Sequence, residues 1–158
     1  MTTELLQLVE RLELLPHPEG GFYKETYRSE ETLELQDRNL LTSIYFLLSS
    51  ENVSHFHRIK SDELWYYHTG SAVTVHTLDE KGHTAFKLGP DVANGELPFY
   101  LVKKDTIFGS TVEAPHSYGL VSCAVAPGFD FRDFELFERK ELLELFPDHV
   151  EIVTKLTR

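Results

Sequence analysis

Short segments in which apolar and polar residues alternate follow one another through most of this chain, separated by turn residues about every ten positions. Alternation with a period of two places successive side chains on opposite faces of a β-strand. Too few residues lie between the segments for crossover helices, which argues against a parallel α/β architecture. The pattern predicts an all-β sandwich or barrel. The expected strands are 22–29, 41–49, 55–59, 63–69, 72–78, 83–88, 98–103, 106–112, 118–125 and 129–137.

The two ends of the chain carry a helical pattern instead. Apolar residues recur three and four positions apart in residues 4–15, and Pro16 and Pro18 follow, so we expect an N-terminal helix within residues 1–15. In the C-terminal segment 138–158, RKELLELF before Pro147 predicts a short helix, and HVEIVTKLT fits either a strand or a helix. In the last predicted strand the phenylalanines change phase at Arg132–Asp133, which favours a β-bulge there.

Composition narrows the class of protein. The chain has 158 residues, enough for one domain with a real core, and we expect residues 1–158 to form a single domain. A formal charge of −11 and scattered Lys and Arg argue against nucleic acid as a partner. No apolar run approaches the ~20 residues that span a bilayer, and the N-terminus lacks the apolar region of a signal peptide. We therefore expect a cytoplasmic protein without a membrane partner, with the single cysteine, Cys123, buried in its core.

Residues 54–70, SHFHRIKSDELWYYHTG, hold the strongest candidates for chemistry. His55 and His57 lie two positions apart, so in a strand both imidazoles point to one face. Glu63 follows across a short polar turn. Two imidazoles and a carboxylate suit metal ligation or general acid/base catalysis. The alternative is that the histidines only line a polar barrel mouth and bond to water and neighbours.

Aromatic residues nearby predict the walls of a cavity. Trp65 and Tyr67 share one face of their strand, and such walls suit a planar or sugar-like ligand. Tyr23 and Glu25 alternate along the first strand, which fits either a strand that borders a cavity or a subunit interface, or a charged edge strand that resists aggregation. His17, in PHPE, fits a lid over the pocket or a loop residue without a role. Three further histidines are expected at the surface: His76, His83 and His149.

Three blocks of sequence resemble the cupin superfamily, and most of all its small single-domain type-five cupins, a group of unassigned function. They are PHPEGGFYKETYRS (16–29), SHFHRIKSDELWYYHTG (54–70) and VAPGFDFRDFELF (125–137). The resemblance implies a double-stranded β-helix, the jelly-roll barrel of cupins, over residues 20–137. It also implies a homodimer.

Two details of the superfamily's metal motifs differ in this chain. The first motif matches His55, His57 and Glu63, but one extra residue before Glu63 leaves Asp62 as a competing inward carboxylate. The second motif, which supplies a third metal-binding histidine, is not legible in residues 103–112. His116 lies beyond that stretch and reaches inward only if its loop folds over the mouth.

The resemblance implies a pocket for a small polar molecule and leaves two classes of function open. One is an enzyme. It either uses a loosely bound Mn, Fe, Ni or Zn on His55, His57 and Glu63, or acts without metal as an isomerase or epimerase, with His57 as base and Tyr67 as acid. The other is a non-catalytic ligand-binding or storage-like cupin. In either class the expected ligand-binding residues are Tyr23, Glu25 and Trp65.

Overall fold

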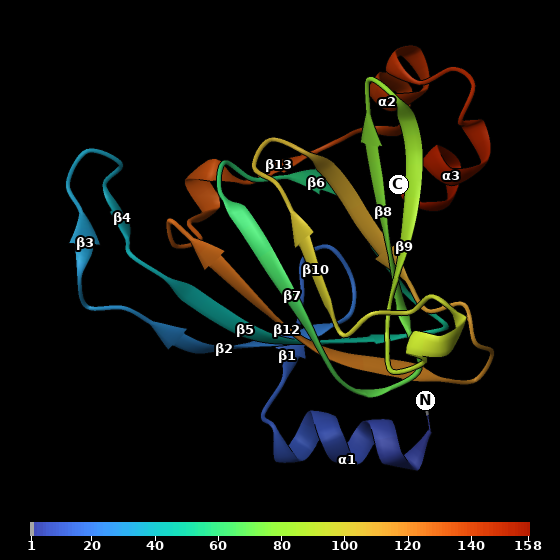
Figure 1. The fold of residues 1–158 in the computed structure, drawn as a ribbon, viewed down its shortest axis with the longest axis horizontal. Coiled ribbons are helices and arrows are strands. Elements are labelled where there is room, and N and C mark those ends of the chain that lie inside the picture. The colour runs from blue at the N-terminus through green and yellow to red at the C-terminus, as the bar shows by residue number, and fades with distance from the viewer. Residues whose placement is uncertain (1) are drawn as a thin grey trace.

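A computed structural model describes residues 2–158, and most of the chain forms two antiparallel sheets packed face to face (Figure 1). The order in the larger sheet is β1-β2-β5-β12-β7-β10, and in the smaller sheet β13-β6-β11-β8-β9. From β5 to β8 and again from β9 to β13, each successive strand lies in the opposite sheet. This alternation is the jelly-roll arrangement, so the expected all-β fold is confirmed.

The strands of the larger sheet are β1 (Leu15–Pro16), β2 (Phe22–Arg28), β5 (Thr42–Ser49), β7 (Asp62–Gly70), β10 (Phe99–Val102) and β12 (Tyr118–Ala126). Those of the smaller sheet are β6 (Val53–Arg58), β8 (Val73–Asp79), β9 (Gly82–Leu88), β11 (Ile107–Thr111) and β13 (Glu135–Leu136). A small hairpin, β3 (Thr32–Leu33) and β4 (Arg38–Asn39), projects away from the barrel as an arm (Figure 1). Every strand predicted before residue 126 is present, with each end within two residues of its expected position.

Alternate residues of one strand reach two different cores. On β12, Val121, Cys123 and Val125 face the main core between the two sheets. Tyr118 and Leu120 of the same strand pack on the outer face, beneath helix α1 (Thr3–Arg11). Alternate side chains of β12 therefore fill two different packed layers, and because both layers are apolar, this strand is apolar almost throughout.

Helices cover the outer faces at both ends of the chain (Figure 1). Helix α1 begins at Thr3, where the Thr2 side chain accepts a hydrogen bond from the Leu5 amide, and it ends at Arg11, earlier than expected. Residue 1, included in the predicted helix, lies outside the described residues. Helices α2 (Arg139–Leu145) and α3 (Val150–Lys155) pack a separate apolar cluster against β6, β8 and β11. The segment HVEIVTKLT, for which the sequence fitted either a strand or a helix, thus contains a helix.

The predicted strand 129–137 is wrong. Residues Phe131–Asp133 form a 3-10 helix, η2, and only Glu135–Leu136 pair as β13. Side-chain contacts explain the difference: the Asp130 carboxylate accepts from the Arg132 amide at 2.8 Å and so closes a turn. This turn, rather than the expected bulge at Arg132–Asp133, produces the change of phase.

Two further observations bear on the sequence-based expectations. His76 is 5% exposed, so the prediction that it lies at the surface is wrong: β8 is an inner strand, flanked by β11 and β9. Among residues 2–158, no helix is both long enough and apolar enough to cross a membrane.

Candidate functional site

A pocket opens between the two sheets at the end of the barrel where β2, β5, β7 and β12 meet the 129–134 turn. Its solvent-accessible volume is about 60 Å³, and it is lined by His17, Tyr23, Thr42, Ile44, His57, Ile59, Glu63, Cys123, Val125, Phe129, Phe131 and Phe134. An adjoining chamber of about 30 Å³ shares several of these walls and adds Phe46, Ser54, Trp65 and Phe108. We call the two together the barrel pocket. It has room for a few waters or a small organic group.

His57 is a buried ionisable group in the wall of this pocket. Its Nδ1 lies 2.6 Å from the carbonyl oxygen of His55. Because a carbonyl can only accept, Nδ1 carries the proton, and Nε2 of the neutral ring is an acceptor. The ring lies between Phe108 and Phe134, with centroids 4.2 and 5.4 Å away. Burial lowers the pKa of His57 to about 4, so the ring is neutral at pH 7.

Glu63 is a second buried ionisable group in the pocket. Its Oε2 accepts a hydrogen bond from Trp65 Nε1 at 3.0 Å, and only 9% of the residue is exposed. Burial raises the pKa of Glu63 to about 7, despite the opposing effect of the Trp65 hydrogen bond. The neighbouring Asp62 instead accepts from the Lys104 amide at 2.9 Å. Of the two competing carboxylates, Glu63 is therefore the one in the pocket.

A β-bulge separates His55 from His57. In the β6–β11 ladder His57 pairs with Phe108 and Ser54 with Ser110, so His55 and Phe56 together oppose the single residue Gly109. The extra residue breaks the period of two, and Ser54 rather than His55 joins His57 at the pocket wall. The expectation that both imidazoles share one face is therefore wrong.

His55 is engaged elsewhere. Its backbone N–H and its Nδ1 both lie within hydrogen-bond distance of the Glu19 carbonyl oxygen, at 3.0 and 2.7 Å. Among residues 2–158, no three His, Cys, Asp or Glu side chains come close enough together to hold a metal ion. The arrangement therefore does not fit the metal site expected from His55, His57 and Glu63, and no step below is routed through a metal.

The residues expected to bind ligand separate into two groups. Tyr23 lines the larger part of the barrel pocket, of about 60 Å³, and Trp65 lines the adjoining chamber of about 30 Å³. Glu25 is not a lining residue; its carboxylate binds Arg28 at 2.7 Å.

Tyr67, the expected acid partner of His57, does not line the barrel pocket. Its hydroxyl donates to the Gly70 carbonyl oxygen at 2.6 Å, next to a register shift between β7 and β12. The structure thus does not bring Tyr67 and His57 together at this pocket.

Two further residues line the pocket: His17, for which the sequence left open a lid over the pocket or a loop residue without a role, and Cys123, which was expected only to be buried in the core. His17 lines both parts of the pocket, with its ring edge-on to Tyr23 at 4.8 Å. The GG pair after PHPE is the one available signal, because two consecutive glycines permit the tight loop that folds His17 back over β2. Cys123 could have been found from the period of two in VSCAV, which aligns it with Val121 and Val125.

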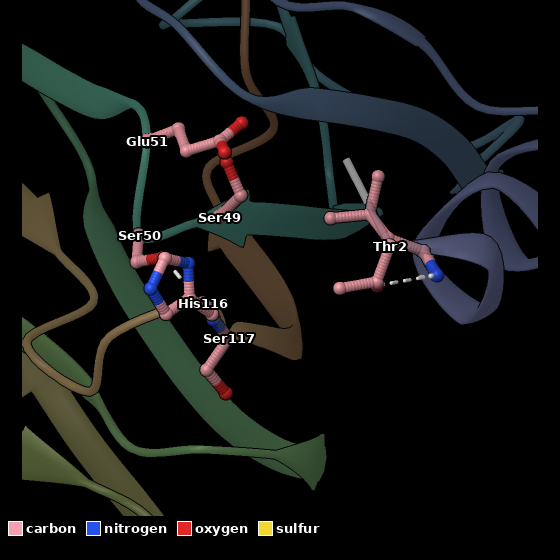
Figure 2. A pocket seen from close by; sticks show the side chains of 7 residues that line it. Thr2, Ser49, Ser50, Glu51, His116 and Ser117 are labelled. Carbon is pink, nitrogen blue, oxygen red and sulfur yellow. Dashed lines mark hydrogen bonds between the residues drawn. The ribbon is translucent and has the colours of Figure 1, made fainter.

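His116 lies in a different depression. Figure 2 shows it with Ser49, Ser50, Glu51 and Ser117 on one side and Thr2, at the start of α1, on the other. This depression has a solvent-accessible volume of about 220 Å³ and shares no lining residue with the barrel pocket. His116 therefore does not cover the barrel mouth.

Known proteins share this fold and part of the sequence. Protein SO0799 from Shewanella oneidensis is 46% identical, with a TM-score of 0.91 over 96% of both chains. A hypothetical protein from Leishmania major is 39% identical, with a TM-score of 0.90 over 99% of both chains. The uncharacterized protein YML079W of Saccharomyces cerevisiae is 28% identical over 159 residues, covering 90% of this chain and 79% of the yeast protein.

The names of these relatives assign no activity. The sequence profile of one family, described as "Cupin superfamily (DUF985)", matches residues 6–137, which is most of the chain and includes every strand of the barrel. The chain therefore belongs to this family of the cupin superfamily.

Proposed function

We propose that the barrel pocket binds a small metabolite and that His57 and Glu63 transfer a proton at one of its carbon atoms, an isomerase- or epimerase-type reaction. One observation carries this proposal: each group has one polar atom tied to the protein and a second one free. The buried side-chain atoms without a partner in the described residues are Glu19 Oε2 and Ser110 Oγ. His57 Nε2 and Glu63 Oε1 have no protein partner and are not among them, so solvent in the pocket reaches both.

Burial gives the two groups complementary proton affinities. It disfavours both charged forms, so His57 stays a neutral base at pH 7, while Glu63, with a pKa of about 7, is partly a neutral acid. A pKa near the working pH suits an acid catalyst.

The proposed step begins at a C–H bond beside a carbonyl. The C–H bond breaks, its proton goes to His57 Nε2, and the electron pair moves through the new C=C bond to the carbonyl oxygen. Glu63 then returns a proton to the opposite face of the same carbon, and the electron pair moves back from the oxygen to restore the carbonyl. Exchange with solvent restores Glu63 and His57 to their starting forms, so the product is an epimer of the substrate.

The proposal keeps some of the sequence-based roles and replaces others. His57 remains the base, Tyr23 and Trp65 remain ligand-binding residues, and Glu63 takes the role of acid in place of Tyr67. Three phenylalanines at the mouth, which favour a planar or ring-shaped ligand, add to the aromatic wall: Phe129, Phe131 and Phe134.

Deuterium incorporation tests this function across many candidate substrates at once. Metabolites that raise the melting temperature are incubated with protein in deuterium oxide and examined by NMR. The wild type is expected to introduce deuterium into at least one of them. Glu63→Gln should slow this by about 10²- to 10⁴-fold. Asp62→Asn, the same carboxylate-to-amide change one residue away and outside the pocket, should leave the rate unchanged.

A metabolite that binds and stabilises the protein but gains no deuterium would contradict catalysis at carbon. The non-catalytic ligand-binding or storage role would then describe the pocket better. Equal losses in Glu63→Gln and Asp62→Asn would contradict the assignment of Glu63 as the acid.

The assembly is also a proposal: two copies form a cytoplasmic homodimer through the outer face of β7 and β10. Helix α1 covers another part of this face, whereas Tyr66, Phe99 and Leu101 are exposed, with the first two rings in contact at 5.4 Å. Light scattering at micromolar concentration should give a dimer. Phe99→Ser should weaken it, and Leu35→Ser, on the exposed β3–β4 arm, should not. A monomeric wild type would contradict the proposal.

A further inference from the structure

The loop between β1 and β2 places a second imidazole, that of His17, in the barrel pocket. Its Nδ1 lies 3.0 Å from the backbone nitrogen of Glu19. Because a backbone N–H can only donate, Nδ1 must be the unprotonated acceptor, and the proton of the neutral ring is on Nε2. Nε2 has no partner in the protein and is not sealed from solvent. The pocket therefore offers a hydrogen-bond donor at His17.

His17 and His57 thus have opposite character. The Nδ1 of His57 donates to a carbonyl, which leaves Nε2 as an acceptor, whereas the Nδ1 of His17 accepts from an amide, which leaves Nε2–H as a donor. Burial keeps both rings neutral by lowering the pKa of each to about 4. Two buried imidazoles in one pocket consequently supply a base and a donor without any positive charge.

The loop that carries His17 is held in place. The His17 N–H donates to the Gly21 carbonyl at 2.9 Å, and the Gly20 N–H donates to the His17 carbonyl at 3.1 Å. From outside the pocket, His55 donates to the Glu19 carbonyl from its backbone. Gly20 has a φ of +110°, and a Cβ on it would lie 1.9 Å from the Val53 carbonyl oxygen, so the loop cannot tolerate a side chain there. The ring of His17 is thereby fixed relative to β6.

No lysine or arginine lines either part of the pocket in the described residues. A carboxylate or phosphate bound there would be buried against aromatic rings, neutral imidazoles and a carboxyl group. An unpaired buried charge is strongly unfavourable. The lining therefore selects against anionic ligands.

Building on the proposed function, we propose that His17 is a catalytic residue whose Nε2–H binds the carbonyl oxygen of an uncharged substrate. As His57 removes the proton from carbon, negative charge develops on that oxygen, and the donor at His17 stabilises it. A neutral imidazole in a fixed position serves this purpose without a proton being transferred. The substrate class is a small uncharged carbonyl compound rather than an acid, a phosphate ester or a nucleotide.

Long-range ¹H–¹⁵N NMR of the ¹⁵N-histidine-labelled protein at pH 7 tests the two tautomers directly, whether or not any reaction occurs. We expect a protonated Nε2 and unprotonated Nδ1 for His17, and the reverse for His57. The signals of His17 are assigned with His17→Asn, because they disappear from the spectrum of that variant. A protonated Nδ1 on His17 would overturn the inference while leaving the proposed function of His57 and Glu63 standing.

Binding of two matched probes tests the substrate class. NMR titration should show that cyclopentanone binds and that cyclopentanecarboxylate binds more weakly. His17→Asn keeps an oxygen acceptor for the Glu19 amide but removes the Nε2 donor, and should weaken cyclopentanone binding about three- to tenfold. His17→Gln keeps an N–H near the Nε2 position and should bind more tightly than His17→Asn. Tighter binding of the carboxylate, or no binding of cyclopentanone up to its solubility, would overturn the inference.

Deuterium exchange separates this inference from the proposed function. For a metabolite found by the exchange assay, His17→Asn should slow exchange by about 10²- to 10³-fold, as expected for loss of one oxyanion donor. Exchange at the wild-type rate in His17→Asn, with a strong loss in Glu63→Gln, would sink only the role of His17. Probe binding that depends on His17 without exchange of any metabolite would contradict the catalytic function, including the catalytic role of His17, and would leave His17 only as a donor to an uncharged ligand.

Discussion

Two buried histidine groups lie on opposite faces of the five-stranded sheet. On the inner face, His57 lies in the barrel pocket; on the outer face, His76 on β8 contacts His83 on β9. Burial lowers the pKa of both His57 and His76 to about 4. The hydrogen bonds differ: His76 uses both ring nitrogens, with His83 at 2.9 Å and Thr111 at 2.8 Å, whereas His57 uses only Nδ1.

The comparison teaches which property marks a candidate site. A buried, neutral histidine with a lowered pKa occurs on both faces, so neither burial nor pKa distinguishes them. The free nitrogen facing a cavity does, because only an untied atom can exchange a proton with a ligand. The outer group is a satisfied structural contact, and the inner group is available for chemistry.

The largest expected effect is on the reaction. Asn at position 57 can still donate to the His55 carbonyl but lacks the Nε2 base. His57→Asn should therefore slow deuterium exchange by about 10²- to 10⁴-fold. His76→Asn should exchange at the wild-type rate, measured on the folded fraction by the same NMR assay. Similar losses of exchange rate in His57→Asn and His76→Asn would contradict the claim that only the inner histidine takes part in the reaction.

A smaller effect is expected on stability in mild alkali. The pKa of Glu63 is about 7 in the folded chain and near 4.5 when unfolded, so the folded state binds more protons between these values. Stability therefore falls as pH rises above 4.5, and the loss is complete once pH has passed through 7, because the buried carboxyl group must ionise. Glu63→Gln should therefore unfold with a free energy about 3 kcal/mol above wild type at pH 8, measured with urea.

The control for that measurement is Asp62→Asn, whose carboxylate is outside the pocket. Asp62→Asn should not increase the free energy of unfolding at pH 8. A Glu63→Gln variant whose stability relative to wild type is the same at pH 5 and pH 8 would show that Glu63 does not titrate in this range.

The smallest expected effect is shared by the two faces. Folded His57 and His76 have pKa values of about 4, below the 6.5 of the free side chain, so the unfolded chain binds more protons between those values. Stability is complete above pH 6.5 and falls as pH drops toward 4. His57→Asn and His76→Asn should each make this decline shallower, by about 1 kcal/mol per pH unit. Urea unfolding across the pH range measures it; a change in only one variant would contradict equal burial.

Much of the fold could be predicted because each barrel strand carries its own period-two pattern and turn residues. The failure at 129–137 has two causes: Asp130 accepts a hydrogen bond from the Arg132 amide, and Arg38 of the arm binds Asp133 at 2.7 Å. The second of these contacts joins residues far apart in sequence. A strand pattern of alternating phenylalanines cannot reveal it.

The site was less predictable for the same reason. His57 and Glu63 could be found from their spacing, but the bulge that removes His55 depends on its pairing with Gly109 in another strand. The place of His17 depends on a loop folding back over β2. Both are consequences of tertiary pairing, which the neighbouring residues do not reveal; the two glycines after His17 permit its loop but do not show where the loop lies.

The pH profile of deuterium exchange tests the central claim most directly, that a neutral His57 and a protonated Glu63 act together. With pKa values of about 4 and 7, exchange should be fastest between these two values and fall above pH 7 as Glu63 ionises. The Glu63→Gln variant should exchange much more slowly than the wild type, and its rate should not fall above pH 7. A wild-type rate that climbs through pH 6.5, as for an ordinary exposed histidine base, and stays high above pH 7 would contradict the account.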